Sequence, residues 1–285
     1  MTAPLFGPGG NSVAFAEAGY SSSVYAPRWL SEQGLDAYEY EAGNGLSASP
    51  DTLATIGLEA KASGISMSYH APYFISLSGI NPKKRLNSVE YIRQSIDAAS
   101  LLGAKIIVVH CGSCAKISRD KAMDLSRDTL YKTLESVDTK GILIGLETMG
   151  KINQLGTVEE VIDLCRMDSR LVPVVDFGHL NARNLGGYFK TAEDYIRIFD
   201  EIGEGLSDDV ARNLHCHFSK IEWGPSGEKK HLTFDDKEYG PDYWPLVEAI
   251  HRWNITPTVI CESAGTQSVD ALAMKRAYNS FKGDK

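Results

Sequence analysis

Residues 105–110 read Lys-Ile-Ile-Val-Val-His, a short apolar run that ends in a histidine. A near-continuous apolar run of this length is typical of a strand buried on both faces, as strands of parallel sheets are. Similar runs recur along the chain, and most are followed by a longer segment with apolar residues near the 3.6-residue period of a helix. The segment 105–110 is therefore one copy of a repeating strand–helix unit.

The repeat predicts eight strands, of which the first is the weakest. They are expected at 4–7, 37–41, 65–70, 105–110, 142–147, 171–176, 213–219 and 258–262. Helices are expected at 51–63, 88–102, 120–137, 157–166, 192–202, 243–253 and 269–281, and irregular segments at 73–84, 181–190 and 221–236. Eight such units favour an α/β fold with a closed (β/α)₈ barrel, the TIM barrel, over an open doubly wound sheet.

Composition and charge narrow the class of protein. The chain has 285 residues, 43% of them hydrophobic and 23% charged, which suits a single barrel domain spanning 1–285. The net charge of −8 argues against a protein that coats nucleic acid through bulk charge. With an odd number of cysteines, no leader-like N-terminus and no long apolar span, we expect a cytoplasmic protein with free thiols and no membrane contact. Nothing in the pattern demands an oligomer, so we expect a monomer.

Metal-ligand side chains end five of the predicted strands, namely His70, His110, Glu147, Asp176 and Glu262. The C-terminal ends of barrel strands meet at one mouth, so these residues should share a pocket. Imidazole and carboxylate bind Zn²⁺, Mn²⁺ and Fe, and paired metals can clamp a phosphoryl group. The pattern therefore predicts a site for more than one metal ion.

Six of the seven histidines lie on strand ends or in the loops that follow them. Besides His70 and His110, these are His179, His215, His217 and His231. A lone histidine is more often a hydrogen-bonded core residue, and a lone acid is commonly a helix cap, but the joint pattern favours a metal site. Strand alternation places His215 and His217 on one face and does not choose between them. His251, in a predicted helix, is expected to be structural and solvent-facing.

The order of motifs from about residue 65 to 262 resembles endonuclease IV, a family of metal-dependent apurinic/apyrimidinic endonucleases with a xylose isomerase-like TIM barrel. The similar segments are His70-Ala-Pro-Tyr-Phe, His110-Cys-Gly-Ser, Leu146-Glu147-Thr, Asp176-Phe-Gly-His179, His215-Cys-His-Phe-Ser-Lys220 and Cys261-Glu262-Ser. The chain looks like a divergent branch, because the family's N-terminal Gly-x-His-x-Ser segment is replaced by Gly7-Pro-Gly-Gly-Asn11.

The resemblance implies a centre of two or three Zn²⁺ ions, with Mn²⁺ or Fe as alternatives. Glu147, Asp176 and Glu262 would be catalytic, and Glu147 would bridge two metals. The resemblance assigns one metal of this centre to His70, His110 and Glu147. A second metal would take Glu147, Asp176, Glu262 and either His215 or His217. A third would take His179 and His231. The family's third-metal motif is Asp-x-His, but Lys229 stands at the Asp position, so Glu228 is the candidate substitute.

The activity that the resemblance implies is cleavage of the phosphodiester 5′ to abasic sites in damaged duplex DNA. Tyr73 resembles a family residue that enters the DNA stack, and Lys220, Arg85 and Lys229 lie in or near predicted loops where they could touch phosphates. The alternative is a metal-dependent sugar isomerase or epimerase of the same superfamily. Such an enzyme needs only one or two metals and has no need of His179 and His231 together.

Overall fold

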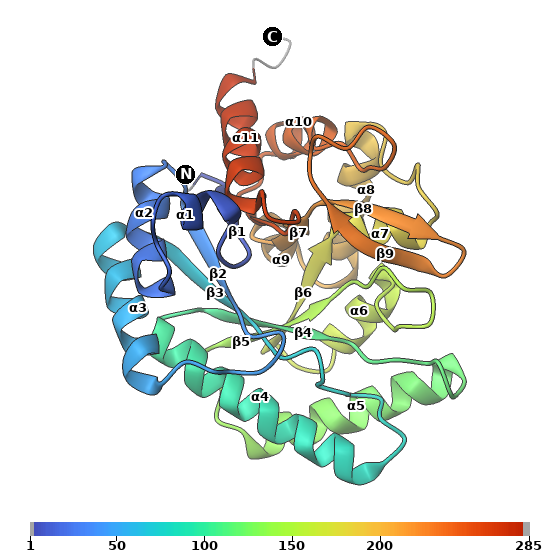
Figure 1. The fold of residues 1–285 in the computed structure, drawn as a ribbon. Coiled ribbons are helices and arrows are strands. Elements are labelled where there is room, and N and C mark those ends of the chain that lie inside the picture. The colour runs from blue at the N-terminus through green and yellow to red at the C-terminus, as the bar shows by residue number, and fades with distance from the viewer. Residues whose placement is uncertain (1–2, 282–285) are drawn as a thin grey trace.

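The computed structural model of the chain describes residues 3–281 and contains the expected parallel barrel (Figure 1). Eight strands pair side by side in the order β1-β10-β7-β6-β5-β4-β3-β2. Their bounds are β1 Leu5–Pro8, β2 Ala37–Glu41, β3 Ser66–His70, β4 Ile106–His110, β5 Leu143–Glu147, β6 Leu171–Asp176, β7 His215–Phe218 and β10 Thr258–Cys261. Strands β8 (Lys220–Gly224) and β9 (Gly227–Leu232) form a separate antiparallel hairpin after β7.

Helices follow the barrel strands and surround them on the outside (Figure 1). Their bounds are α1 Val13–Glu17, α2 Ala26–Glu32, α3 Pro50–Ser63, α4 Pro82–Leu102, α5 Arg119–Ser136, α6 Val158–Cys165, α7 Phe177–Arg183, α8 Ala192–Gly205, α9 Asp208–Arg212, α10 Trp244–Trp253 and α11 Gln267–Ser280, with a 3₁₀ turn at Ser23–Tyr25. The (β/α)₈ fold predicted from the strand–helix period is thus confirmed.

Strands β1 and β2 close the barrel. The backbone N–H of Gly10 donates to the Glu39 carbonyl at 2.9 Å, and that of Asp36 donates to the Phe6 carbonyl at 2.9 Å. A Cβ atom on Gly7 would lie 1.9 Å from the Ala37 carbonyl oxygen. Only glycine allows the two backbones to approach this closely at that position.

The apolar run 106–109 packs on both sides of the barrel wall. Ile106 and Val108 face the barrel interior and pack with Val174 of β6. Ile107 and Val109 belong to the larger core between the strands and the outer helices. Both faces of β4 are therefore dry, which explains why its sequence lacks an apolar–polar alternation.

The structure corrects the prediction that 221–236 is irregular, because most of it forms the β8–β9 hairpin. The two strands are joined by the two residues Pro225 and Ser226, and Gly227 adopts a positive φ of 88°. Charged side chains on β9 hide the alternation that usually marks a strand. A two-residue loop flanked by glycines was the available signal.

Two further predicted loops are partly helical. Helix α4 begins at Pro82, because Asn81 accepts a hydrogen bond from the Lys83 N–H and proline suits the first helical position. Helix α7 covers the start of the segment 181–190, and Asp176 caps it by accepting from the His179 N–H. Helices α1, α2 and α9 were not predicted. Each of these helices is short or starts in a polar stretch, where the apolar period is weak.

Candidate metal centre

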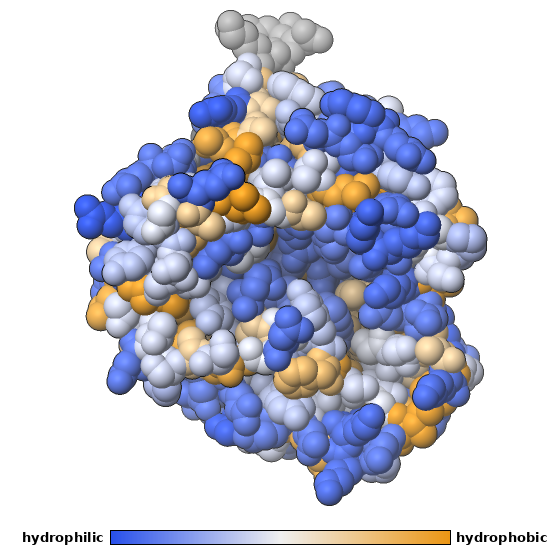
Figure 2. Space-filling view, in the orientation of Figure 1, coloured by the Kyte–Doolittle hydropathy of each residue, from blue (hydrophilic) through white to orange (hydrophobic). Residues whose placement is uncertain are grey.

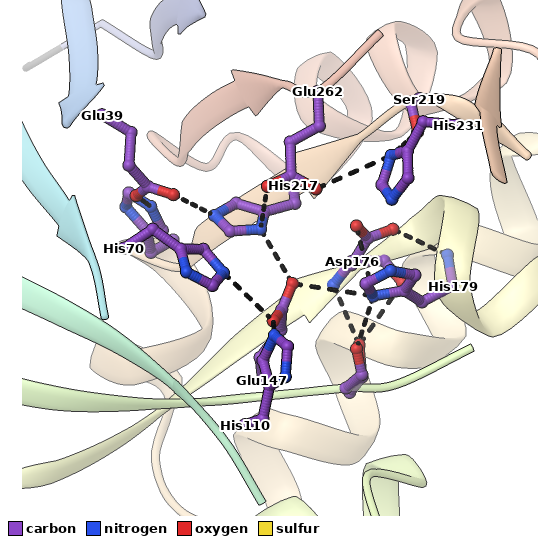
Figure 3. A network of polar contacts seen from close by, with 12 residues as sticks. Glu39, His70, His110, Glu147, Asp176, His179, His217, Ser219, His231 and Glu262 are labelled. Atoms are coloured by element: carbon purple, nitrogen blue, oxygen red, sulfur yellow. Dashed lines mark hydrogen bonds and ion pairs between the residues drawn. The ribbon is translucent and has the colours of Figure 1, made fainter. Parts of the chain in front are cut away.

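Glu147, the last residue of β5, lies at the centre of the strand-end side chains (Figure 3). Its side chain is 1% exposed. Oε1 lies 2.9 Å from His217 Nδ1, whereas Oε2 lies 3.2 Å from His110 Nε2 and 3.6 Å from His70 Nε2. The two carboxylate oxygens therefore face different imidazoles, as a carboxylate that bridges two ions must.

Strand register explains why residues so distant in sequence meet here. Neighbouring parallel strands pair His110 with Glu147, and Asp176 with His217. Because these residues lie at the C-terminal ends of their strands, in-register pairing brings their side chains to the same mouth of the barrel. The sequence pattern of strand ends and the barrel geometry thus lead to the same cluster.

Asp176 and His179 extend the cluster along α7. Asp176 Oδ1 accepts a hydrogen bond from the His179 N–H at 2.7 Å. Its buried Oδ2 has no hydrogen-bond partner among residues 3–281 and lies 3.4 Å from His179 Nδ1. His179 Nδ1 lies 3.0 Å from the Thr148 carbonyl oxygen. Because a carbonyl oxygen only accepts, Nδ1 carries the proton in the neutral ring, which leaves the lone pair of Nε2 for a metal ion.

The donor atoms form adjoining groups that fit divalent metal ions. In each group the atoms lie within 4.8 Å of one another. Three groups lie around Glu147 and His179, namely His70–Glu147–His217–Glu262, Glu147–Asp176–His179 and His179–Glu228–His231, and two more contain Glu39, namely Glu39–His215–His217 and Glu39–Glu41–Glu262. Among residues 3–281, the buried Glu147 Oε2 and Asp176 Oδ2 have no hydrogen-bond partner. A buried carboxylate oxygen without a partner is unfavourable, and a bound cation removes that penalty.

The pKa shifts have the pattern of carboxylates and imidazoles that compensate one another. Burial raises the pKa of Glu147, but contacts with His110, His217 and His70 outweigh it and hold this pKa well below its ordinary value. Burial lowers the pKa of His70, but Glu41 and Glu147 raise it to about 10. In the absence of metal, protonated histidines therefore compensate the negative charge of the buried carboxylates, as bound metal ions would.

A one-residue β-bulge in β9 sets which side chains of the hairpin face the centre. Pairing is regular up to Glu222 and Lys230, but the next pair joins Trp223 to Glu228, so Lys229 is the extra residue. In an unbroken strand, Lys229 would share a face with His231, because side chains alternate. The bulge breaks that alternation, so the residues of β9 before Lys229 are shifted to the opposite face.

As a result, Glu228 rather than Lys229 faces the histidines. Its Oε2 lies 3.5 Å from His179 Nε2, and it groups with His179 and His231. The Lys229 ammonium lies instead 3.1 Å from Glu222, on the outer side. The position that breaks the Asp-x-His motif is thereby removed from the pocket, and a carboxylate takes its place.

The loop after β5 holds Glu228 in this position. The Glu228 N–H donates to the Gly150 carbonyl at 3.1 Å. A Cβ atom on Gly150 would lie 2.6 Å from the Cβ of Glu228, and one on Gly227 would lie 2.2 Å from the Gly150 carbonyl oxygen. The hairpin can therefore approach this loop only because both positions are glycine.

The two histidines of β7 have different surroundings. His217, which is fully buried, lies 2.9 Å from Glu147 and 3.3 Å from Glu262 through Nδ1. His215 lies one step deeper in the barrel, where its Nε2 is 2.9 Å from Glu39 Oε2. The structure therefore brings His217 to the strand-end cluster, whereas His215 lies beneath it.

Sequence reasoning missed Glu39 and Glu41 of β2. Glu41 ends its strand next to His70, so the rule that selected the other strand ends would have found it. Glu39 lies two residues earlier and shares its face. Burial raises the pKa of Glu41 to about 7, and its Oε1 has no hydrogen-bond partner within 3–281.

Tyr73 lies over the cluster and is 54% exposed. Its ring stacks on His110 at a centroid distance of 5.4 Å and meets His70 edge-on at 5.2 Å. A Cβ atom on Gly43 would collide with this ring at 2.1 Å, so glycine makes room for it. Tyr73 thus forms an exposed aromatic wall of the candidate metal site.

The basic side chains predicted to bind phosphates do not face the mouth of the barrel. Lys220 Nζ donates to the Asp236 carbonyl at 2.6 Å, and Arg85 donates to the Gly79 carbonyl at 2.7 Å from a side chain that is 12% exposed. With Lys229 turned to Glu222, none of these three lines the described pockets at the mouth. His251 is structural as expected, but it is half-buried, stacked on Tyr278 of α11.

The mouth of the barrel is a hollow, and Figure 2 shows hydrophilic surface in it. A 470 Å³ pocket is lined by Lys151 and by seven of the metal-ligand candidates, namely His70, His110, Glu147, His179, Glu228, His231 and Glu262. Pockets of 590 and 540 Å³ adjoin it on either side of Tyr73, and Lys84 lines the larger one. Lys84 and Lys151 are therefore the lysines that line these pockets.

Two general features complete the description. All five cysteines carry free thiols. Within residues 3–281, no helix combines the length and apolar character needed to cross a membrane.

Two relatives by sequence cover most of the chain. An uncharacterised protein of Methanocaldococcus jannaschii is 28% identical over 256 residues, which is 88% of this chain and 90% of that protein. A probable endonuclease 4 of Mycobacterium tuberculosis is 26% identical over 254 residues, or 86% of this chain and 91% of that one.

Two solved structures share the fold. A D-tagatose 3-epimerase-like protein has a TM-score of 0.70 at 20% identity, covering 90% of this chain and 95% of its own. Endonuclease IV from Thermus thermophilus has a TM-score of 0.69 at 18% identity, covering 97% of this chain and 98% of its own. A family model described as xylose isomerase-like TIM barrel matches residues 27–278, and the chain belongs to this family.

Proposed function

We propose that this protein is a metal-dependent phosphodiesterase that cleaves duplex DNA 5′ to abasic sites. The observation that carries the proposal is the second group of ligands beside the central one. His179, Glu228 and His231 stand together next to Glu147, although the loop lacks the Asp-x-His motif. An enzyme that needs one or two metals does not need this group of ligands, whereas a trinuclear phosphodiesterase requires it.

The sequence relatives support the same proposal. Relatives that span most of the chain include probable endonuclease 4 proteins, at 26–27% identity. These relatives favour a nuclease over other activities of the xylose isomerase-like barrels.

In this mechanism, the side chains of the chain hold and orient the reacting groups. Divalent ions, with Zn²⁺ expected, supply a hydroxide nucleophile and stabilise charge on the phosphoryl group. Glu147 would bridge two ion positions, while Asp176 and Glu262 would complete them with His217. The buried carboxylates fix these positions before substrate arrives, so little reorganisation is needed during the reaction.

Contacts with DNA would come from the exposed parts of the mouth. Tyr73 has the exposure and the position to stack against a base or fill the gap left by a missing one. Lys84 and Lys151 line the pockets and can contact phosphates on either side of the scissile bond. This assignment replaces Arg85, Lys220 and Lys229 as the main phosphate contacts.

The alternative is a sugar epimerase or isomerase, and one observation favours it. Glu41 and Glu262 lie on the side of the mouth where no Lys or Arg lines the described pocket. Such a wall suits sugar hydroxyls better than phosphates, and an epimerase also needs carboxylates that move protons. The fold likeness to a D-tagatose 3-epimerase-like protein is compatible with either activity.

Two assays, DNA incision and sugar interconversion, separate the two candidates. Purified protein is incubated with a labelled duplex that carries one abasic site, with Zn²⁺ or Mn²⁺ and then with excess EDTA. We expect metal-dependent incision 5′ to the site and no cleavage of the matched undamaged duplex. Absence of incision, together with interconversion of a ketose–aldose or epimer pair, would establish the alternative.

A further inference from the structure

Two polar side chains lie beneath the metal centre, inside the barrel. Glu39 is 0% exposed and His215 is 8% exposed. His215 Nε2 lies 2.9 Å from Glu39 Oε2, and His217 Nε2 lies 2.8 Å from Glu39 Oε1 (Figure 3). The carboxylate is thus held between one histidine of the centre and one histidine outside it.

Neither of the facing atoms has another partner in the described part of the chain. Within residues 3–281, the buried atoms Glu39 Oε1 and His217 Nε2 have no hydrogen-bond partner, and they face one another as an ion pair at 2.8 Å. A buried carboxylate requires compensation of its charge, and a buried ring nitrogen requires a polar neighbour. Each atom is therefore the partner that the other needs.

We propose that Glu39 is a positioning residue that fixes the ring of His217 for metal binding, with His215 as its support. The inference rests on the proposed metal centre. A histidine binds metal through an unprotonated nitrogen, and His217 turns Nδ1 toward Glu147 and Glu262. The remaining ring proton then lies on Nε2, and this N–H faces the Glu39 Oε1 atom.

His215 completes the arrangement by holding the other oxygen of Glu39. Without it, the carboxylate could rotate and leave His217 Nε2 without a partner. Carboxylates that orient a metal-binding histidine typically raise metal affinity by about 10–100-fold. This role explains why β7 carries two histidines two residues apart, although only His217 contacts Glu147.

The test is metal affinity, which needs no nucleic acid substrate. Zn²⁺ binding is measured by competition with a chromophoric chelator, and the Co²⁺-substituted protein is followed by its visible absorption spectrum. Glu39→Gln keeps the side-chain volume and removes the charge, so we expect Zn²⁺ to bind about 10–100-fold more weakly and the Co²⁺ spectrum to change. His215→Gln should shift both readouts in the same direction by a smaller factor.

Asp270→Asn provides the matched control. Asp270 is also a buried carboxylate, 7% exposed, but it bonds the Phe234 N–H and the Thr266 hydroxyl outside the metal centre. This variant should lower thermal stability and leave Zn²⁺ affinity and the Co²⁺ spectrum unchanged. The comparison separates loss of a buried charge from loss of orientation.

The outcomes are distinguishable. If the unaltered protein binds no metal, the proposed function fails; if it binds metal and Glu39→Gln binds equally well, only the positioning role fails. Loss of one metal ion per chain in His215→Gln would make His215 a ligand of its own ion and overturn the proposal. Should Glu39→Gln not fold, Glu39→Asp, which withdraws the charge by one methylene, replaces it, and unchanged affinity there counts against the role.

Discussion

At the scale of single residues, Glu147 has the most contacts with the other candidate ligands. It lies within 3.6 Å of ring nitrogens from four histidines, on β3, β4, β7 and α7. A residue in that position affects every neighbouring ion site. Its substitution should therefore be more damaging than that of any ligand at the edge of the cluster.

We predict that Glu147→Gln lowers the incision rate by on the order of 10²-fold or more, because the bridging charge is lost. The rate is measured on the abasic duplex, and metal per chain by mass spectrometry. Glu17→Gln, on an exposed helix end, should behave like the unaltered protein. Turnover of Glu147→Gln at the rate of that control would reject a bridging role.

The lysines provide a second test at this scale. Lys151 lines the metal pocket, whereas Lys229 pairs with Glu222 on the outer side. We predict that Lys151→Ala weakens DNA binding and reduces the slope of log affinity against log salt by about 1, as expected for one lost phosphate contact. Lys229→Ala should leave the slope unchanged. A larger effect from Lys229 would restore the assignment made from the sequence.

At the scale of elements, the bulge in β9 compensates for a departure in sequence. Lysine in the pocket would repel metal ions, but the bulge turns Lys229 outward and Glu228 inward. Glycines at 150 and 227 keep the hairpin against the loop after β5. The group of His179, Glu228 and His231 thus depends on backbone geometry as much as on residue type.

Gly150→Ala tests that dependence. The added methyl group would lie 2.6 Å from the Glu228 Cβ, so the hairpin must shift and carry Glu228 away from His179. We expect metal affinity at this group of ligands to fall by about 10-fold or more, with the central ligands unaffected. Zn²⁺ titration followed by mass spectrometry measures it. Gly203→Ala in α8 is the control. Equal metal content in both variants would show that the close approach of Gly150 to Glu228 does not hold the metal ligands.

The hairpin also shows where pattern recognition fails. Its strands carry few apolar residues: Ile221 is buried and Trp223 half-buried on β8, whereas β9 carries Glu228, Lys229 and Lys230. Periodicity of hydrophobic residues is the main signal of a strand, and β9 lacks it. The register, and the bulge within it, follow only from the turn and from contact with the barrel.

At the scale of the whole molecule, the centre links stability to pH and metal. Without metal, burial lowers the pKa of His70 and His179, but nearby carboxylates outweigh it and raise these values to about 10 and about 9. A histidine whose pKa rises on folding stabilises the fold fully below its unfolded pKa of about 6.5. That contribution is lost as pH rises through the folded pKa.

We therefore predict that EDTA-treated protein loses thermal stability between about pH 6.5 and 10, as pH rises through the folded pKa values of His179 and then His70. Metal-loaded protein should lose less, because the ions rather than protons offset the buried carboxylates. Melting temperatures of both forms across this range provide the measurement. Parallel pH curves for the two forms would show that the carboxylates do not depend on metal for compensation.

The sequence by itself determined the barrel and most of the cluster. Period and strand length are local properties, and they predicted eight parallel strands with His70, His110, Glu147, Asp176 and Glu262 at their ends. The barrel then makes those ends converge whatever the details of packing. The prediction held because it needed only the period and the closure of the sheet.

Tertiary structure alone decided the finer assignments. Whether His215 or His217 meets Glu147 depends on depth within the barrel, because alternation gives both the same face. Whether Lys229 or Glu228 enters the pocket depends on a one-residue bulge. Such choices are set by register between segments far apart in the chain, and residue types and spacing carry no direct record of that register.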